Sequence, residues 1–288
     1  MIFKNQKRNN SGFTLVETAF LIIIGSSILT VILTGLNTHI QKQKYERTQE
    51  KIALIDEAIL RYVEENDRYP CVASYESLLD TTDFGVELNT PDDMGCPPPP
   101  PTPDGVILSG DNNVYIGMVP VRTLNLPDDY ALDGWGGRIT YAVTIQQSRQ
   151  LEYGISGGLI AVIDGAGSTL SVNSSYVIIS HGNENDGGYS VLGIKEENCP
   201  AEPNLEAQNC DGDSTFRKTI HADVHGSSTN FDDLIFYPGA LDGTSLKVPA
   251  YAVLPFKRMG KSNCPSGWVR HDPQPEHLNA NYLYCRKM

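Results

Sequence analysis

Apolar and polar positions divide the start of the chain into two stretches. From Phe13 to Leu36 nearly every residue is apolar or small, and Glu17 is the only charged one. At about 1.5 Å per residue, a helix over this run would extend roughly 36 Å, more than the ~30 Å hydrocarbon core of a bilayer. The run therefore predicts an apolar helix that can cross a membrane, with one carboxylate that needs a partner or a purpose.

Beyond Leu36 the pattern becomes that of an amphipathic helix. Charged residues separate apolar ones that recur at three- and four-residue spacing, namely Tyr45, Ile52, Ile55, Ile59 and Tyr62. A polar turn at Asn66 and Asp67 predicts the end of the helix. We expect one helix over residues 13–66, with a transmembrane half over 13–36 and an amphipathic half that packs on a globular domain. A coiled-coil stalk is the alternative, but the apolar spacing continues over too few residues to form one.

Short β-type runs follow from about Val106, separated by Gly, Asn and Asp. They read VYIGMVPV, GRITYAV, GLIAVI, SYVIIS and YSVLGI. The fold class predicted is α+β, with the long N-terminal helix packed on an antiparallel sheet. The globular domain is expected over residues 67–198, and a disulfide-containing C-terminal region over 199–288.

The cysteines indicate the redox compartment of the protein, and the net charge limits its binding partners. All six cysteines follow the apolar run, and they are Cys71, Cys96, Cys199, Cys210, Cys264 and Cys285. An even count predicts up to three disulfides in an oxidising compartment, and pairing of sequence neighbours is possible although spacing alone does not fix it. The formal charge of −13 argues against broad nucleic-acid binding.

Enzyme motifs are weak. GISGG, residues 154–158, has the G-x-S-x-G pattern, but the strand-like LIAVI follows where a nucleophile elbow needs a helix. The pair of histidines in HADVH, residues 221–225, lacks the Glu of a zinc protease helix. We expect no enzymatic activity.

An acidic turn is the best candidate for a metal site. Its hard oxygen donors, followed by two glycines, are Asn183, Glu184, Asn185 and Asp186. The spacing is not that of an EF-hand, so a turn without metal is the more common explanation. The segment DGDSTF, residues 211–216, is an alternative site of similar standing.

The segment SGFTLVE, behind a basic leader and before the apolar run, resembles the processing site of type IV prepilins and secretion pseudopilins. The resemblance implies that prepilin peptidase cuts between Gly12 and Phe13, removes residues 1–12 and methylates the new N-terminus. It also implies that Glu17 meets the amine of a neighbouring subunit's Phe13 during assembly. A secretory signal peptide and a plain membrane anchor are the alternatives. The apolar run is too long for a signal peptide and no A-x-A cleavage site follows it, while a plain anchor leaves Glu17 unexplained.

Later segments also resemble this family: YVEENDRYP at the helix exit, DGWGGRITYAV before a strand, and VIISHGNENDGG at the acidic turn. The resemblance implies a structural subunit that self-associates into a helical filament, with an inner-membrane assembly platform as a further partner. The precursor would lie in a bacterial inner membrane, and the product in a surface filament or a periplasmic pseudopilus. Some secretion pseudopilins hold calcium in a comparable turn. A minor pilin, a pseudopilin or a filament-tip adhesin remain alternatives.

Overall fold

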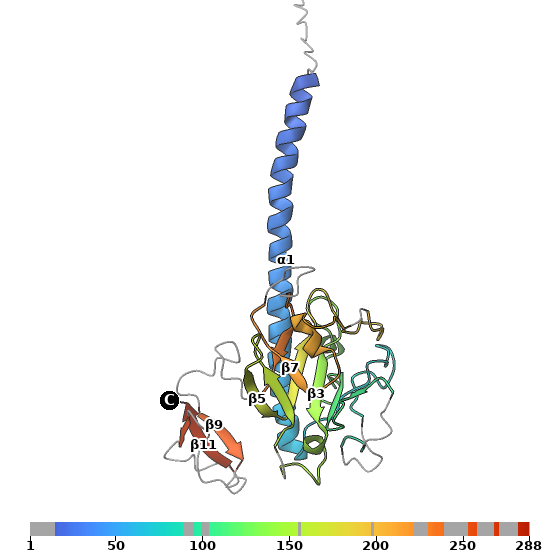
Figure 1. Ribbon diagram of the computed structural model, residues 1–288, viewed down its shortest axis with the longest axis vertical. Coiled ribbons are helices and arrows are strands. Elements are labelled where there is room, and N and C mark those ends of the chain that lie inside the picture. Colours follow the sequence, from blue (N-terminus) through green and yellow to red (C-terminus); the bar gives the residue numbers. More distant parts are fainter. Residues whose placement is uncertain are drawn as a thin grey trace, which may run out of the picture. The chain divides into compact units, whose positions relative to one another are not determined.

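The computed structural model describes most of the chain as two compact units, Met1–Pro238 and Gly239–Met288 (Figure 1). The described residues are 15–88, 95–98, 104–154, 157–196, 199–221, 230–238, 253–257, 268–270 and 282–287. The proposed processing residues Gly12 and Phe13 lie outside them.

The first unit begins with one long helix, α1 (Leu15–Asn66), of 52 residues. It ends where the polar turn predicted it: Asp67 has a φ of 53°, in the left-handed region, and its N–H donates to the Val63 carbonyl at 3.0 Å. The Asn66 side chain also donates to the Tyr62 carbonyl. These bonds satisfy carbonyls at the helix end, which explains why the helix stops there.

The expected transmembrane half of the helix, residues 13–36, is wrong. Within the described part of the chain, no helix is both long and apolar enough to cross a membrane. A crossing needs about 20 consecutive apolar residues. The apolar run of α1 whose side chains the structure describes goes from Leu15 to Ile24 and includes Glu17.

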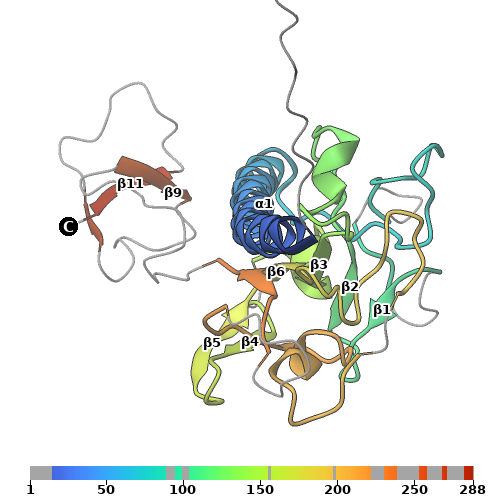
Figure 2. The same ribbon diagram turned by 90° about the horizontal axis from the view of Figure 1, so that it is seen from above.

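An antiparallel five-stranded sheet packs against the second half of α1, as the α+β prediction required (Figure 2). Its strands are β1 (Ile107–Leu108), β2 (Val114–Met118), β3 (Thr140–Thr144), β6 (Tyr176–Ser180) and β8 (Leu234–Phe236), in the order β1-β2-β3-β6-β8. Tyr141, Tyr176 and Ile178 share one hydrophobic core with Ile55 and Ile59 of the helix.

A smaller sheet and short 3-10 helices complete the first unit. The sheet consists of β4 (Ile160–Ile163), β5 (Thr169–Ser174) and β7 (Thr215–Arg217), with β7 parallel to β4. The 3-10 helices are η1 (Asp128–Ala131), η2 (Ile145–Ser148) and η3 (Leu205–Asn209). The run YSVLGI, expected as a strand, instead forms isolated bridges at Tyr189 and Ser190 followed by a turn. The hydrogen bond from Gly193 N to Ser190 O closes that turn.

The second unit is a three-stranded antiparallel sheet. It contains β9 (Val253–Lys257), β10 (Trp268–Arg270) and β11 (Tyr282–Lys287), in the order β10-β11-β9. The predicted pair Cys264 and Cys285 involves a residue, Cys264, outside the described part. The other two predicted disulfides, Cys71–Cys96 and Cys199–Cys210, are confirmed.

The loop before β3 approaches α1 very closely. Gly134 N donates to Thr48 Oγ1 at 2.8 Å, and Trp135 Nε1 donates to Gln41 Oε1 at 2.7 Å. A Cβ on Gly134 would overlap the backbone oxygen of Lys44. The helix and this loop therefore meet backbone to backbone, and only glycine fits at that position.

Gly134→Ala should lower the free energy of unfolding by about 1–3 kcal/mol, because neither backbone can move aside without breaking hydrogen bonds. Urea denaturation monitored by circular dichroism measures this. Gly110→Ala is the control, since a Cβ there has nothing within 4 Å, and its change should stay within about 0.5 kcal/mol. Equal stabilities of the two variants would contradict the close approach.

A buried carboxyl of α1 also joins the helix to the sheet. Asp56 is 4% exposed and accepts a hydrogen bond from the Tyr176 hydroxyl. Burial raises the pKa of Asp56 to about 6, against the opposing effect of the Tyr176 hydrogen bond. The folded protein therefore holds this proton at pH values where the unfolded chain releases it.

This pKa predicts that Asp56 destabilises the fold as the pH rises. Between pH 4 and 6 the native state binds more protons than the unfolded chain, so its contribution to stability falls by about 3 kcal/mol and stays lost above pH 6. Asp56→Asn should remove this slope while keeping an acceptor for Tyr176. Urea midpoints across pH 4–7 test it, with exposed Glu64→Gln as the control that keeps the wild-type slope. Parallel profiles for wild type and Asp56→Asn would refute the assignment.

Candidate functional site

The acidic turn after β6 wraps around a carboxylate from a distant segment. Asp232 Oδ2 accepts hydrogen bonds from the backbone N–H groups of Asn183, at 2.7 Å, and Glu184, at 2.9 Å. Two residues of the turn have left-handed backbones, Gly182 with φ 62° and Asn185 with φ 56°. Asp232 lies just before β8, which pairs with β6, so the sheet itself brings the two segments together.

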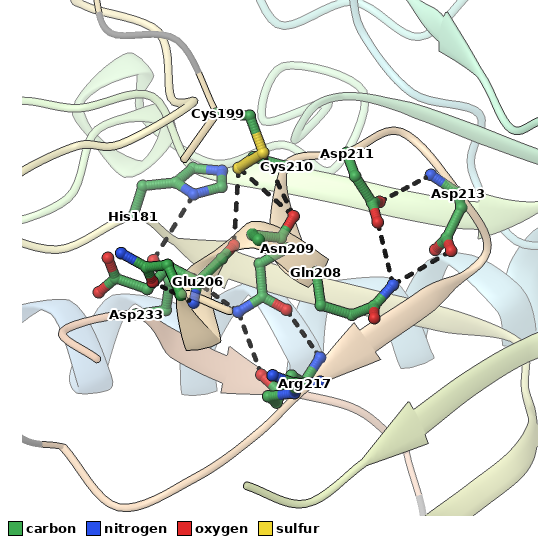
Figure 3. The surroundings of a disulfide bond; sticks show 12 residues. His181, Cys199, Glu206, Gln208, Asn209, Cys210, Asp211, Asp213, Arg217 and Asp233 are labelled. Atoms are coloured by element: carbon green, nitrogen blue, oxygen red, sulfur yellow. Dashed lines mark hydrogen bonds and ion pairs between the residues drawn. A yellow bond between two sulfur atoms is a disulfide. The ribbon is translucent and has the colours of Figure 1, made fainter. Parts of the chain in front are cut away.

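The Cys199–Cys210 disulfide closes a loop that carries a third part of the site (Figure 3). Within it, Asn204 caps η3 by accepting from the N–H of Glu206 at 2.8 Å. The Glu206 side chain is buried, and its Oε1 accepts from the N–H of Asp232 at 2.7 Å. The disulfide loop thus points a carboxylate at the segment before β8.

Asn209 fixes this loop against β7 and against a further acid (Figure 3). Its Nδ2 donates to Asp233 Oδ2 at 2.6 Å and to the Arg217 carbonyl at 3.1 Å, while its Oδ1 accepts from Arg217 N at 2.7 Å. The position of η3 is therefore determined by side-chain hydrogen bonds as well as by the disulfide.

Five carboxylates meet where these segments converge. Glu184, Asp186 and Glu206 form one group and Glu206, Asp232 and Asp233 another, and in each group one oxygen per residue lies within 4.8 Å of the others. Glu206 belongs to both. We call the set of five the carboxylate centre. Glu206, Asp232 and Asp233 are at most 6% exposed, and the other two are partly exposed.

Burial and mutual repulsion make the centre's protons hard to remove. Burial, and then the Asp233 charge, raise the pKa of Glu206 to about 8. Burial also raises the pKa of Asp232 to about 6, although the Glu184 N–H opposes the shift. In the described chain no lysine or arginine pairs with Glu206, Asp232 or Asp233.

A histidine lies beside the centre. His181 is 3% exposed, and its Nδ1 lies 3.6 Å from Asp233 Oδ1 with no hydrogen-bond partner. Its Nε2 contacts Thr140 Oγ1 at 3.1 Å, and Thr140 in turn contacts the Tyr75 hydroxyl at 2.6 Å. These contacts hold the imidazole edge toward the centre.

Of the four turn residues predicted as metal ligands, two belong to the carboxylate centre and two form hydrogen bonds elsewhere. Glu184 and Asp186 belong to the carboxylate centre. Asn183 Oδ1 instead accepts from Gln41 Nε2 of α1 at 3.3 Å, and Asn185 Nδ2 donates to Glu196 Oε2 at 3.4 Å.

The alternative site at residues 211–216 is a closed turn. Asp211 accepts from Asp213 N at 3.1 Å, Asp213 accepts from Thr215 N at 2.6 Å, and Gln208 Nε2 donates to both acids. Figure 3 shows this turn on the side of η3 away from Glu206 and Asp233. Its carboxylates belong to neither group of the centre.

Sequence reasoning missed the three buried acids of the carboxylate centre. Glu206, Asp232 and Asp233 are far from the acidic turn along the chain, and only the pairing of β6 with β8 and the disulfide loop bring them together. The one signal was FDD, residues 231–233, where two acids follow an aromatic residue directly before a short apolar run.

No protein-family model, curated protein or solved structure matches the chain. The function is therefore argued from the residues and their geometry.

Proposed function

We propose that the chain is the structural subunit of a type IV pilus-like filament, assembled through the N-terminal part of α1. The observation that carries the proposal is the exposure of apolar side chains there. Leu15 is 86% exposed and Ile22 is 69% exposed, whereas Ile55 and Ile59 in the second half are fully buried. One helix thus packs on its own domain at one end and presents apolar surface at the other.

The exposed apolar surface is large enough to offset the cost of association with identical helices. Burying a large apolar side chain contributes roughly 1.5–3 kcal/mol. Seven such residues lie in this exposed stretch: Leu15, Val16, Phe20, Leu21, Ile22, Ile23 and Ile24. Their summed contribution, on the order of 10–20 kcal/mol, is comparable with the ~4–15 kcal/mol cost of association. Each subunit of a helical filament has several neighbours, so the gain is repeated.

The resemblance of SGFTLVE to prepilin processing sites supports the same assembly. Glu17 lies exposed in the first turn of α1, where the partial positive charge of the helix N-terminus favours a carboxylate. In an assembled filament it would meet the amine of a neighbouring subunit's Phe13. A charge pair inside an apolar bundle sets the register of the helices, because a displaced helix leaves both charges unpaired.

A minor or tip subunit with a binding module is the second candidate. The observation in its favour is that Gly239–Met288 forms a compact unit of its own, after the helix-and-sheet unit along the chain. A pseudopilin or minor pilin would use the same helix for assembly and differ in abundance. The fraction of sheared surface material that the subunit makes up separates these roles.

Processing should leave a mature chain that begins at Phe13. Gly12→Ala should accumulate the full-length precursor, since a side chain at the residue before the cut obstructs the peptidase. Intact mass and N-terminal sequencing of chain from membranes and from sheared filaments measure this. Ser11→Ala is the control and should be processed normally. A wild-type chain that begins at Met1 in every fraction would refute the processing proposal.

Glu17→Val should be processed normally but should reduce the yield of sheared filaments by about tenfold or more, because the neighbour's amine is left without a partner in an apolar bundle. Thr18→Val is the matched control: it adds the same apolar bulk at the adjacent exposed position and keeps the charge. Wild-type filament yield from Glu17→Val would exclude the pairing of charges.

A further inference from the structure

We propose that the carboxylate centre binds one divalent cation of the size of calcium, with Glu206, Asp232 and Asp233 as its inner ligands and Glu184 and Asp186 at its partly exposed side. The inner ligands all lie beyond residue 198, outside the segments that resemble pilins. The proposal does not rest on filament assembly.

The spacing of the oxygens fits calcium. Calcium–oxygen distances of about 2.3–2.6 Å place ligands on opposite sides of the ion roughly 4.6–5.2 Å apart. The oxygens of each group lie within 4.8 Å of one another, so one ion can contact all three residues of a group. Magnesium dehydrates reluctantly and usually keeps several waters with one or two carboxylates, so a set of several carboxylates suits calcium better. Carboxylates alone also select hard cations over zinc or copper.

A buried oxygen without a partner points to a missing ligand. Asp232 is 1% exposed, and its Oδ2 is held by two backbone N–H groups of the acidic turn. Its Oδ1 is buried with no hydrogen-bond partner among the described residues. A carboxylate fixed by one oxygen and unsatisfied at the other is oriented to coordinate an ion with the second.

The charge of the centre leads to the same conclusion. Burying a carboxylate is costly unless it is paired, and Glu206, Asp232 and Asp233 have no lysine or arginine partner in the described chain. Two positive charges from one cation would offset most of their repulsion. His181 Nδ1 is a second buried polar atom without a hydrogen-bond partner among the described residues, 3.6 Å from Asp233 Oδ1 at the edge of the centre.

An amide beside the centre can supply a further oxygen. Asn230 Nδ2 donates to Glu184 Oε2 at 2.7 Å and lies 3.3 and 3.4 Å from the two oxygens of Glu206. Rotation of the amide by 180° would exchange its nitrogen and oxygen. The Asn230 carbonyl would then face the same position, as a neutral ligand beside the carboxylates.

The test is calcium binding by the full chain in detergent micelles after removal of metals by chelation. Calorimetric titration with calcium chloride should give one site per chain. At about 100 times the Kd, the melting temperature should rise by roughly 5–10 °C. Magnesium chloride should bind at least about tenfold more weakly.

Glu206→Gln is the decisive variant, because it removes the ligand shared by both groups and keeps an acceptor for Asp232 N. It should bind calcium at least about tenfold more weakly, and without calcium it should melt no lower than wild type, since glutamine has the shape of the carboxyl and adds no buried charge. Asp213→Asn is the matched control, in the turn just after the disulfide loop, and should bind like wild type. Asp232→Asn serves as a second ligand variant if Glu206→Gln does not fold.

Three results would overturn the proposal. The first is no heat and no melting shift with calcium, which would mean that the centre holds shared protons instead. The second is unchanged affinity in Glu206→Gln and Asp232→Asn. The third is loss of affinity in Asp213→Asn, which would place the ion in the turn at 211–216. This binding experiment does not depend on filament yield. The calcium proposal can therefore fail while the filament proposal holds, and the reverse.

Discussion

The packing of the second half of α1 on the central sheet is the contact on which the rest of the structure depends. Strands β2, β3 and β6 are buried along their full lengths, so the sheet cannot stay folded with its helix-facing side open to water. The helix also satisfies polar groups at its edge, because Lys51 Nζ donates to the carbonyls of Asp129 at 2.5 Å and Leu132 at 2.7 Å. The same helix therefore completes the core and ties down the loops that flank it.

Two buried cations elsewhere in the unit have their charges satisfied by ion pairing or hydrogen bonds. Arg68 and Glu87 form a buried ion pair at 2.8 Å, and Glu87 also accepts from Tyr62 and from the N–H of Cys71. Arg138 is fully buried, and its guanidinium donates to the carbonyls of Tyr75, Ser190 and Val191.

The carboxylate centre is different. Its buried acids accept hydrogen bonds from N–H groups of the turn and of Asn209. Among the described residues, no lysine or arginine forms an ion pair with them. Within the described chain, Asp56 and Asp133 are also buried without a lysine or arginine partner, but each is a single carboxyl held by hydrogen bonds, from Tyr176 and from Ser180 and three backbone N–H groups respectively. Among the described residues, groups of three acids occur only at the carboxylate centre, so a cluster without a cation is specific to this place. That specificity makes an ion from outside the chain a better explanation than general tolerance of buried acids.

The parts that sequence patterns predicted are those set by local rules. The end of α1 followed from a polar turn, strands β2, β3, β4 and β6 from short runs of β-forming residues, and two disulfides from neighbouring cysteines. The errors have identifiable causes. YSVLGI has the composition of a strand, yet its glycine lies at φ 74° and makes it a turn. The carboxylate centre needed contacts between segments tens of residues apart, which no local pattern contains.

The exposed apolar part of α1 and the carboxylate centre are linked through one residue, Gln41. Gln41 accepts from Trp135 and donates to Asn183, so it ties α1 both to the loop before β3 and to the acidic turn. Before it along the helix, the described side chains are exposed; after it, the burial against the sheet begins. The acidic turn is in turn held by Asp232 of the carboxylate centre. A cation at the centre would therefore stiffen the point at which the exposed part of α1 leaves the domain.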